Sequence, residues 1–291
     1  MALPCTIESW RSKGDFIEFN GHRIFYLDSD KNSERPTVVL VHGFPTSSWD
    51  WCFIWPELTS KFRVIAMDLL GFGFSDKPTD IIYSIHLQAD VVEAVARACK
   101  ISQATLLVHD YGVSVGQELL ARQNQKRIFS IRGICFLNGG LFPETHRARF
   151  IQKLLNSPLG FLIARLGNEK KFRSSFSAVF GARTRPSEEE LRAYWRLIAE
   201  QDGHRIFHRL IRYIEDRKQH RTRWVAALEN AEIPIRLING VDDPVSGAHM
   251  LARYRALLGE GDIVELEGIG HYPQCESPKA VVTAFFAFAQ A

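Results

Sequence analysis

The feature that most restricts the fold of this chain is a series of eight short apolar runs separated by helical patterns and turn residues. In chain order the runs are DFIEF, HRIFYLD, TVVLVHG, FRVIAMDL, ATLLVHD, IRGICFLNG, IPIRLING and DIVELEG. The first two flank Asn20-Gly21, a dipeptide that favours a hairpin turn. The later runs are rich in Val, Ile and Leu, which is typical of parallel strands buried on both faces. The alternation predicts an α/β fold with a mostly parallel eight-stranded sheet flanked by helices.

Length and charge restrict the kind of protein further. The chain has 291 residues, 46% of them hydrophobic, which is enough to bury a sizeable core. A net charge of only +3 argues against nucleic acid as the main partner. No stretch reaches the roughly 18 apolar residues that span a membrane. The N-terminus has no apolar run before its first charges, so we expect no secretory signal.

The cysteines indicate a reducing compartment. There are five, an odd number, and none of them forms a C-x-x-C pair. This pattern suits free thiols in the cytoplasm better than disulfides or a zinc site. The sequence predicts a cytoplasmic protein with no metal site and no cofactor.

One interval interrupts the alternation of strands and helices. Residues 141–224 contain helical patterns and chain breakers but no strand pattern. A helical insertion between the sixth and seventh strands predicts a lid over the strand ends. We therefore divide the chain into an α/β core domain, residues 1–140 and 225–291, and a helical lid, residues 141–224.

Two helices and a charge excess are predicted in this lid. Ser187 and Glu190 form a capping box that opens one helix, and the next helix carries Ile206, Leu210 and Ile214 on one face. The lid holds 18 Lys and Arg against 9 Asp and Glu. We interpret this excess as a solvated helical surface, in preference to a surface for an anionic substrate or a membrane.

The string VHDYGVSVGQELL contains two candidate nucleophiles, Asp110 and Ser114. Ser114 lies in GVSVG, which matches the G-x-S-x-G pattern of serine hydrolases and would make the protein an esterase. The run ATLLVHD, however, can end as a strand at Asp110, with Gly112 allowing a tight turn into the following helix. A nucleophile elbow places its reactive side chain directly after the strand, so we assign the nucleophile to Asp110. Ser114 then lies one turn into the helix, where we expect its hydroxyl to bond a backbone carbonyl.

Further candidate residues follow other strands. Phe44 follows the third strand, and the backbone N–H groups of Phe44 and Tyr111 are placed to form an oxyanion hole. Asp243 follows the seventh strand and His271 the eighth. The order Asp110, Asp243, His271 at successive strand ends is that of a catalytic triad on an open α/β sheet.

The chain resembles α/β-hydrolases of the epoxide hydrolase and haloalkane dehalogenase branch over essentially its whole length. The stretches that carry this resemblance include HGFPTSSWDW, DLLGFGFSDKP, HDYG and GHYPQCESP. Within the branch, VHDYG, NGGLFPETHR, TRPSEEEL and IRYIEDRKQHRTRW are similar to mesoderm-specific transcript proteins. The resemblance implies the α/β-hydrolase fold with a helical lid inserted after strand 6. We expect no leading hydrophobic segment of the membrane-anchored kind in this chain.

Residue by residue, the resemblance makes Asp110 the nucleophile, His271 the base and Asp243 the acid that orients it. Asp243 is preferred to Asp242 because it directly precedes Pro244, as the acid of this family usually does. Attack by Asp110 on an epoxide or carbon–halogen carbon would give an alkyl ester. Water activated by His271 would then hydrolyse that ester.

The resemblance also implies a role for Tyr213, which stands where epoxide hydrolases carry a lid tyrosine that protonates the leaving oxygen. A tyrosine packed in the core is the alternative interpretation. In three places the chain departs from the branch. Tyr111 replaces the usual Trp, Phe44 replaces an Asn that often binds halide, and only Tyr194 offers a weak substitute for the second lid tyrosine.

These features predict a hydrolase that acts on small apolar epoxides. Three alternatives remain open at the level of the sequence. They are haloalkane dehalogenation, ester cleavage by Ser114, and a non-catalytic protein that binds a ligand under the lid.

Overall fold

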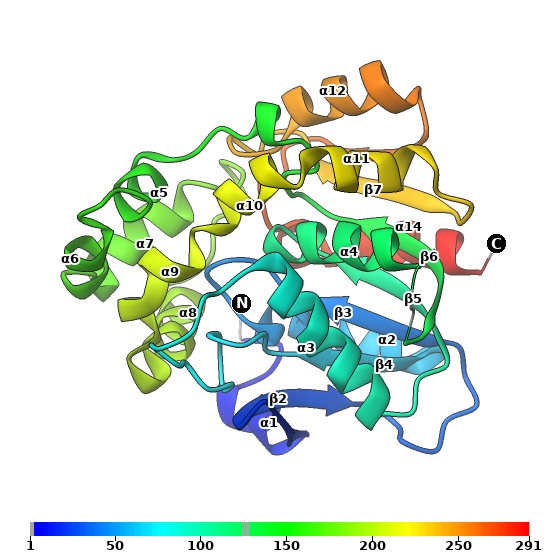
Figure 1. Ribbon diagram of the computed structural model, residues 1–291, viewed down its shortest axis with the longest axis horizontal. Helices are drawn as coiled ribbons and strands as arrows, with labels where there is room; N and C mark the ends of the chain where they lie inside the picture. The colour runs from blue at the N-terminus through cyan, green and yellow to red at the C-terminus, as the bar shows by residue number, and fades with distance from the viewer. Residues whose placement is uncertain (1–2, 124, 126–127, 291) are drawn as a thin grey trace.

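Eight strands form one sheet in the computed structural model, which describes residues 3–123, 125 and 128–290 (Figure 1). The strands are β1 (Gly14–Phe19), β2 (His22–Asp28), β3 (Thr37–Val41), β4 (Arg63–Met67), β5 (Gln103–Val108), β6 (Ser130–Phe136), β7 (Ile235–Gly240) and β8 (Asp262–Leu266). Their order across the sheet is β1-β2-β4-β3-β5-β6-β7-β8. The predicted α/β fold with a mostly parallel, eight-stranded sheet is confirmed.

The sheet begins with an antiparallel hairpin and continues as parallel strands. β1 and β2 pair around Asn20 and Gly21, whose φ angles of 50° and 79° suit the predicted hairpin turn. β2 is antiparallel to β4, and the strands from β4 through β3 to β8 pair in parallel. The loops that follow β3, β5, β7 and β8 therefore meet at one edge of the sheet.

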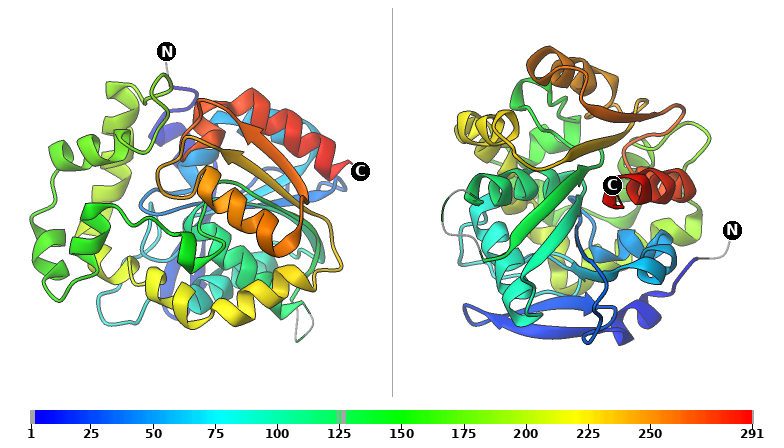
Figure 2. Two further views of the ribbon diagram at one scale, coloured as in Figure 1. Left: turned by 90° about the horizontal axis from the view of Figure 1, so that it is seen from above. Right: turned by 90° about the vertical axis from the view of Figure 1, so that its right-hand side faces the viewer.

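Helices cover both faces of the sheet, which explains why the parallel strands are continuously apolar. In β4, Ile65 and Met67 pack into the core on one face, and Val64 and Ala66 pack into the core on the other. The first face is covered by α3 (Ile85–Ala98), α4 (Tyr111–Arg122), α11 (Arg221–Glu229) and α12 (Ala248–Leu258). The second is covered by α1 (Ile7–Ser12), α2 (Trp55–Lys61) and α14 (Pro278–Ala289), with the short helices η1 (Ser48–Phe53) and α13 (Pro273–Glu276) in contact beside them (Figure 2).

Between β6 and β7, residues 141–224 are all described and form helices without a strand. We call this segment the helical insert. Its helices are η2 (Pro143–Thr145), α5 (Phe150–Leu155), α6 (Gly160–Arg165), α7 (Glu169–Ser177), α8 (Glu188–Ala199), η3 (Glu200–Ile206), α9 (Phe207–Leu210) and α10 (Tyr213–Gln219). Helices α5 to α9 gather at the left of Figure 1, while α11 passes through the predicted boundary at 224 and 225 and packs on α4. The division into core and lid domains stays a prediction.

Inside the insert, one predicted helix is present and one is broken. The capping box opens α8, since the Ser187 hydroxyl accepts from the Glu190 N–H and the Glu190 carboxylate accepts from the Ser187 N–H. The single helix predicted through Ile206, Leu210 and Ile214 is wrong, because the chain there forms three short helices, η3, α9 and α10. The three side chains still share one buried cluster, because successive short turns keep a nearly helical spacing.

In the described ranges, no helix combines the length and the apolar character that crossing a membrane would require. Over the same residues, no group of three or more His, Cys, Asp or Glu side chains is arranged to hold a metal ion. All five cysteines are described, and each is a free thiol.

Helix α4 approaches the sheet at two glycines, Gly112 and Gly116, and the two contacts differ. A Cβ added at Gly112 would lie 2.3 Å from the carbonyl oxygen of Val41 and 2.8 Å from that of His42. A Cβ added at Gly116 would lie 2.9 Å from the Cδ1 atom of Ile134. The end of a side chain can rotate away, whereas the backbone at the end of β3 cannot move without disturbing the sheet.

We expect Gly112→Ala to lower the free energy of unfolding by about 3 kcal/mol, because it overpacks a contact with backbone. Gly116→Ala, on the same helix, should change that free energy by less than about 1 kcal/mol, since a gain in helix propensity offsets the displacement of Ile134. Urea unfolding followed by circular dichroism measures both. Equal losses in the two variants would contradict the difference that we infer between the contacts.

Candidate active site

Asp110 lies on a sharp turn between β5 and α4. β5 ends at Val108 and α4 begins at Tyr111, so the strand stops two residues before the predicted end. Asp110 has φ 45° and ψ −101°, a backbone conformation that is unfavourable for a residue with a side chain. Its N–H donates to the carbonyl oxygen of Asn138, just after β6, over 2.8 Å. A strained residue held between strand and helix is the arrangement of a nucleophile elbow.

Ser114 lies inside the first turn of α4 and is fully buried. Its hydroxyl oxygen accepts a hydrogen bond from Nε of Arg217 over 2.6 Å. The sequence predicted a backbone carbonyl as the partner of this hydroxyl, whereas the structure places the guanidinium of Arg217 there. Ser114 is not among the residues that line the cavity next to Asp110.

His271 lies between two carboxylates. Its Nδ1 is 2.7 Å from Oδ2 of Asp243, and its Nε2 is 3.6 Å from Oδ1 of Asp110. All three residues are buried, whereas Asp242 is exposed. The structure therefore brings together the three side chains that the sequence predicted from separate strand ends, and it leaves Asp242 outside.

The carboxylate of Asp243 is held by several hydrogen bonds in addition to the one from His271. Oδ1 accepts from the N–H of Val245 over 2.7 Å, and Oδ2 accepts from the N–H and the hydroxyl of Ser246 over 3.1 and 2.7 Å. Asn138 donates to Oδ2 through Nδ2 over 3.0 Å. These bonds fix the carboxylate that orients the imidazole. The sequence analysis did not identify Asn138 as a site residue. Its place at the end of the predicted sixth strand was the only feature of the sequence that pointed to such a role.

Charge and burial act in opposite directions on the three residues. Burial alone would lower the pKa of His271, but the carboxylates of Asp243 and Asp110 outweigh burial and raise it to about 10. Burial alone would raise the pKa of Asp110, but the positive charges of His271 and Arg217 lower it well below its usual range. Asp243 behaves in the same way: burial opposes ionisation, and His271 lowers the pKa of Asp243. The site therefore rests as an imidazolium between two carboxylates.

Phe44 contributes its backbone to the site. Its N–H donates to Oδ2 of Asp110 over 3.0 Å. The other predicted oxyanion donor, Tyr111, begins α4 directly after Asp110 and is fully buried. Within the described part of the chain, no hydrogen bond joins the Tyr111 N–H to this carboxylate. One of the two predicted donors therefore contacts Asp110 in this state.

Arg217, from α10 of the insert, is a second residue that sequence reasoning missed. Its side chain is almost fully buried, and Nη2 donates to the backbone oxygen of Asp110 over 2.9 Å. Nη2 also lies 4.0 Å from Oδ1 of Asp110. The spacing of Arg217 in the sequence could have indicated its role. It stands four residues after Tyr213, on the face of α10 that carries the buried side chains of Tyr213 and Ile214. In the sequence it is one of many positive charges of the lid.

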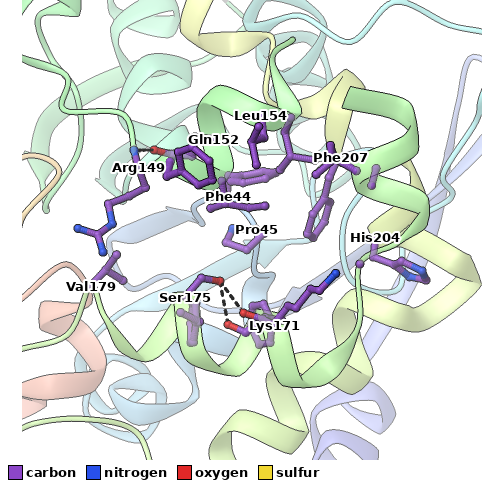
Figure 3. Close-up of a pocket in the computed structure, with 18 of the residues that line it drawn as sticks. Phe44, Pro45, Arg149, Gln152, Leu154, Lys171, Ser175, Val179, His204 and Phe207 are labelled. Atoms are coloured by element: carbon purple, nitrogen blue, oxygen red, sulfur yellow. Dashed lines mark hydrogen bonds between the residues drawn. The ribbon is translucent and has the colours of Figure 1, made fainter. Parts of the chain in front are cut away.

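A cavity of about 520 Å³ is lined by Asp110 and by residues of the insert. Figure 3 shows part of the lining of this cavity. Leu154 and Phe207 of the insert line it together with Phe44 and Pro45 from the loop after β3. The lining is largely apolar, and Asp110 and His271 are the catalytic candidates that reach it. The cavity can hold a small apolar molecule against Asp110.

Tyr213 is buried beside the site but does not line this cavity. The centroid of its ring is 4.9 Å from that of Tyr111 and 6.1 Å from that of Phe44. Its hydroxyl has no hydrogen-bond partner among the described residues. Burial and the negative charge of Asp110 raise the pKa of Tyr213, so the phenol keeps its proton.

Two other tyrosines lie nearby. Tyr272, which follows His271, lines the cavity and was not predicted; its hydroxyl lies 3.5 Å from the carbonyl oxygen of Phe44. Tyr194 is buried away from the cavity, and its hydroxyl is 3.3 Å from Sγ of Cys275. The structure therefore does not bring Tyr194 to the site.

The sequence and the structure are similar to those of known proteins over most of the chain. Residues 36–278 match the family described as alpha/beta hydrolase fold. The chain is 46% identical to the mesoderm-specific transcript homolog protein of Homo sapiens, over 98% of this chain and 88% of that protein. It is also 26% identical to the cis-3-alkyl-4-alkyloxetan-2-one decarboxylase of Shewanella oneidensis, over 93% of this chain and 86% of that one. The crystal structure of haloalkane dehalogenase DbeA from Bradyrhizobium elkani gives a TM-score of 0.81 at 26% identity, covering 95% of this chain and 97% of that chain.

We expect the pKa of His271, about 10 in the unaltered protein, to fall in both Asp110→Asn and Asp243→Asn. Each change removes a negative charge that favours the imidazolium. The larger fall is expected in Asp243→Asn, because Asp243 lies closer to the ring and contributes more to the shift. A titration of labelled histidine followed by NMR measures the pKa. His208, whose pKa is lowered by burial and by its own neighbours, should not change and serves as the control. An unchanged His271 pKa in Asp110→Asn would show that the two groups are not coupled.

Proposed function

The chain belongs to the alpha/beta hydrolase fold family as a relative of the mesoderm-specific transcript proteins, and from that premise we propose that it hydrolyses its substrate through an ester with Asp110. It is a hydrolase of the α/β-hydrolase superfamily. Small apolar epoxides are the substrate class that we propose. Asp110 acts as the nucleophile, His271 as the base and Asp243 as the acid that orients the base.

The observation that carries this proposal is that the two oxygens of Asp110 have different surroundings. Oδ2 accepts the hydrogen bond from the Phe44 N–H, which supports Phe44 as an oxyanion donor. Oδ1 lies 3.6 Å from Nε2 of His271, longer than a normal hydrogen bond, so this oxygen keeps a lone pair for attack. The carboxylate reaches an apolar cavity, where little solvation opposes the nucleophile.

In the first step, Oδ1 of Asp110 attacks a ring carbon of the epoxide and the carbon–oxygen bond on that carbon breaks. The ring oxygen takes a proton from Tyr213, and the product is a hydroxyalkyl ester of Asp110. The hydroxyl of Tyr213 supports this assignment, since it has no competing acceptor among the described residues. Tyr213 does not line the cavity, so this step requires the side chains between its hydroxyl and the epoxide to shift when the epoxide binds. The hydroxyl of Tyr272 already faces the carbonyl oxygen of Phe44.

Ester formation changes the charge that His271 experiences. The ester is neutral, so one of the two carboxylates that raise the pKa of His271 disappears. The pKa of His271 therefore falls after the first step, and the proton that it releases replaces the one lost by Tyr213. Nε2 becomes a base only once there is an ester to hydrolyse.

In the second step, Nε2 of His271 takes a proton from water as the water attacks the carbonyl carbon of the ester. Negative charge develops on Oδ2 of Asp110, next to the N–H of Phe44, and we assign the second donor to Tyr111. The tetrahedral intermediate expels the alkoxide, which takes the remaining proton of the attacking water, so that the products are the diol and the carboxylate of Asp110 with His271 again an imidazolium. Epoxide and water are thereby converted into a diol with no other reactant.

Dehalogenation is the second candidate, and the likeness to DbeA is the observation that favours it. A halide leaving group depends on N–H donors from side chains next to the nucleophile. In this chain those positions are occupied by Phe44 and Tyr111, which offer none. The relative from Shewanella oneidensis is named for an alkyl-substituted oxetanone, also a strained ring. That name supports a strained cyclic electrophile for this chain.

We expect His271→Gln to accumulate a covalent adduct, because Asp110 can still attack but no base activates water. Incubation with a panel of epoxides, haloalkanes and p-nitrophenyl esters, followed by intact-mass spectrometry, should give protein heavier by one epoxide. This is also the experiment that tests the proposed function. Unchanged mass with every member of the panel would refute it and would favour a protein that only binds a ligand.

Two further variants serve as controls for the identity of the nucleophile. Asp110→Asn combined with His271→Gln should form no adduct. Ser114→Ala should keep most of the turnover, because its hydroxyl is buried against Arg217 and away from the cavity. An inactive, folded Ser114→Ala beside an active Asp110→Asn would assign the chemistry to Ser114 instead.

We expect Tyr213→Phe to slow ester formation roughly 10²-fold, about 2.7 kcal/mol, by analogy with the loss of one oxyanion donor. Hydrolysis of a preformed ester should be nearly unchanged, because the phenol acts only in ring opening. Stopped-flow measurement of single turnovers separates the two rates. Tyr272→Phe, the matched control in the cavity, should slow ester formation much less. Equal losses in both steps of Tyr213→Phe would mean that Tyr213 is a packing residue.

A further inference from the structure

Large exposed apolar side chains are concentrated in one part of the molecule. Seven such side chains are found among the described residues, and six of them lie between residues 150 and 166. The six are Phe150, Ile151, Leu159, Phe161, Leu162 and Leu166, which we call the apolar tip. Phe150 is 76% exposed, Leu166 64% and Leu159 60%. Soluble proteins rarely leave a cluster of this kind in contact with water without a partner.

The apolar tip belongs to α5, α6 and the residues around them, at the end of the insert farthest from the sheet (Figure 1). A view from above also shows these helices at the outer end of the molecule (Figure 2). Phe150, Ile151 and Leu166 are exposed and also line the cavity that reaches Asp110. The apolar surface is therefore continuous from the outside of the insert to the candidate nucleophile.

Positive charge surrounds the apolar tip. Residues 147–171 contain six Lys and Arg and a single acidic residue, Glu169, which pairs with Arg173. The six are Arg147, Arg149, Lys153, Arg165, Lys170 and Lys171, which we call the basic rim. None of them forms an ion pair with any described residue. Their charges are free to meet a negatively charged partner.

We propose that the apolar tip and its basic rim form a docking surface for an anionic lipid bilayer. Apolar side chains inserted at the headgroup boundary lose water, while Lys and Arg around them are attracted to anionic headgroups. A second copy of this chain fits less well, because two identical surfaces would bring like charges together. The charge excess alone indicated only a solvated surface; the exposed apolar side chains among those charges favour a membrane.

This inference goes beyond the proposed function, because docking depends on α5 and α6 and not on the chemistry of Asp110. It also gives a reason for three residues of the tip to line the cavity. An apolar substrate dissolved in the bilayer would enter past Phe150, Ile151 and Leu166 without crossing water. The enzyme would then draw its substrate from the lipid phase.

The test is co-sedimentation with vesicles made of equal parts phosphatidylglycerol and phosphatidylcholine, and with vesicles of phosphatidylcholine alone, in the absence of substrate. We expect binding to the anionic vesicles that weakens as salt is added, because salt screens the basic rim. Leu159→Ser combined with Phe161→Ser should reduce that binding roughly 30-fold. Neither residue lines the cavity, so the active site stays intact.

Matched controls distinguish docking through the apolar tip from nonspecific binding to vesicles. Ile82→Ser removes an exposed apolar side chain outside the tip and should leave binding unchanged. Lys153→Gln with Arg165→Gln should weaken binding about tenfold. Lys100→Gln with Lys279→Gln makes the same change in net charge away from the tip and should have little effect. Circular dichroism confirms that each variant is folded.

Three outcomes of the vesicle experiment would overturn the proposal. They are no binding to anionic vesicles, binding that survives Leu159→Ser with Phe161→Ser, and equal loss in the tip and control variants. A dimer in sedimentation velocity that the tip variant converts to a monomer would also overturn it, because a second copy would then cover the surface. Turnover of soluble epoxides does not enter these measurements, so a failure here is distinct from a failure of the proposed function.

Discussion

The candidate site depends on Asn138, which joins the two carboxylates that flank His271. Its backbone oxygen accepts the N–H of the strained Asp110, and its side chain donates to Asp243 and to the carbonyl oxygen of Gly240. The N–H of Gly240 donates in return to Oδ1 of Asn138 over 2.7 Å. One residue at the end of β6 therefore sets the loops after β5 and β7 at a fixed separation. His271, from the loop after β8, lies between the two carboxylates that Asn138 holds in place.

Four charged groups then share one buried volume. Two carboxylates, one imidazolium and the guanidinium of Arg217 compensate one another, and no single charge is left alone. Because Arg217 comes from the insert, the core alone does not complete this balance. The neutral ester that we propose on Asp110 would disturb the balance, and the proton on His271 is the part that could then leave. In the proposed mechanism, this change of charge would set the order of the two steps.

Features that follow from a local sequence pattern were predicted best. Features that depend on packing between segments far apart in the sequence were predicted less well. The eight strands could be predicted because helices cover both faces and leave continuous apolar runs. The proximity of Asp110, Asp243 and His271 could be predicted because parallel strands end at the same edge. Asn138 and Arg217 were missed because their roles appear only when β6 and α10 meet the turn at Asp110. The break between Ile206 and Tyr213 was missed because side-chain spacing is nearly the same in one helix and in three short ones.

The G-x-S-x-G match can be explained by the same packing. Gly112 stands two residues after Asp110, where a Cβ would collide with the carbonyl oxygens of Val41 and His42. Gly116 lies one turn later on the same face, against Ile134 and Val108. The spacing of these glycines is therefore set by the approach of α4 to the sheet, whichever residue is the nucleophile. Ser114 falls between them, and its hydroxyl accepts a hydrogen bond from Arg217. The serine of the motif therefore lies one helical turn after Asp110, which occupies the nucleophile position of the elbow.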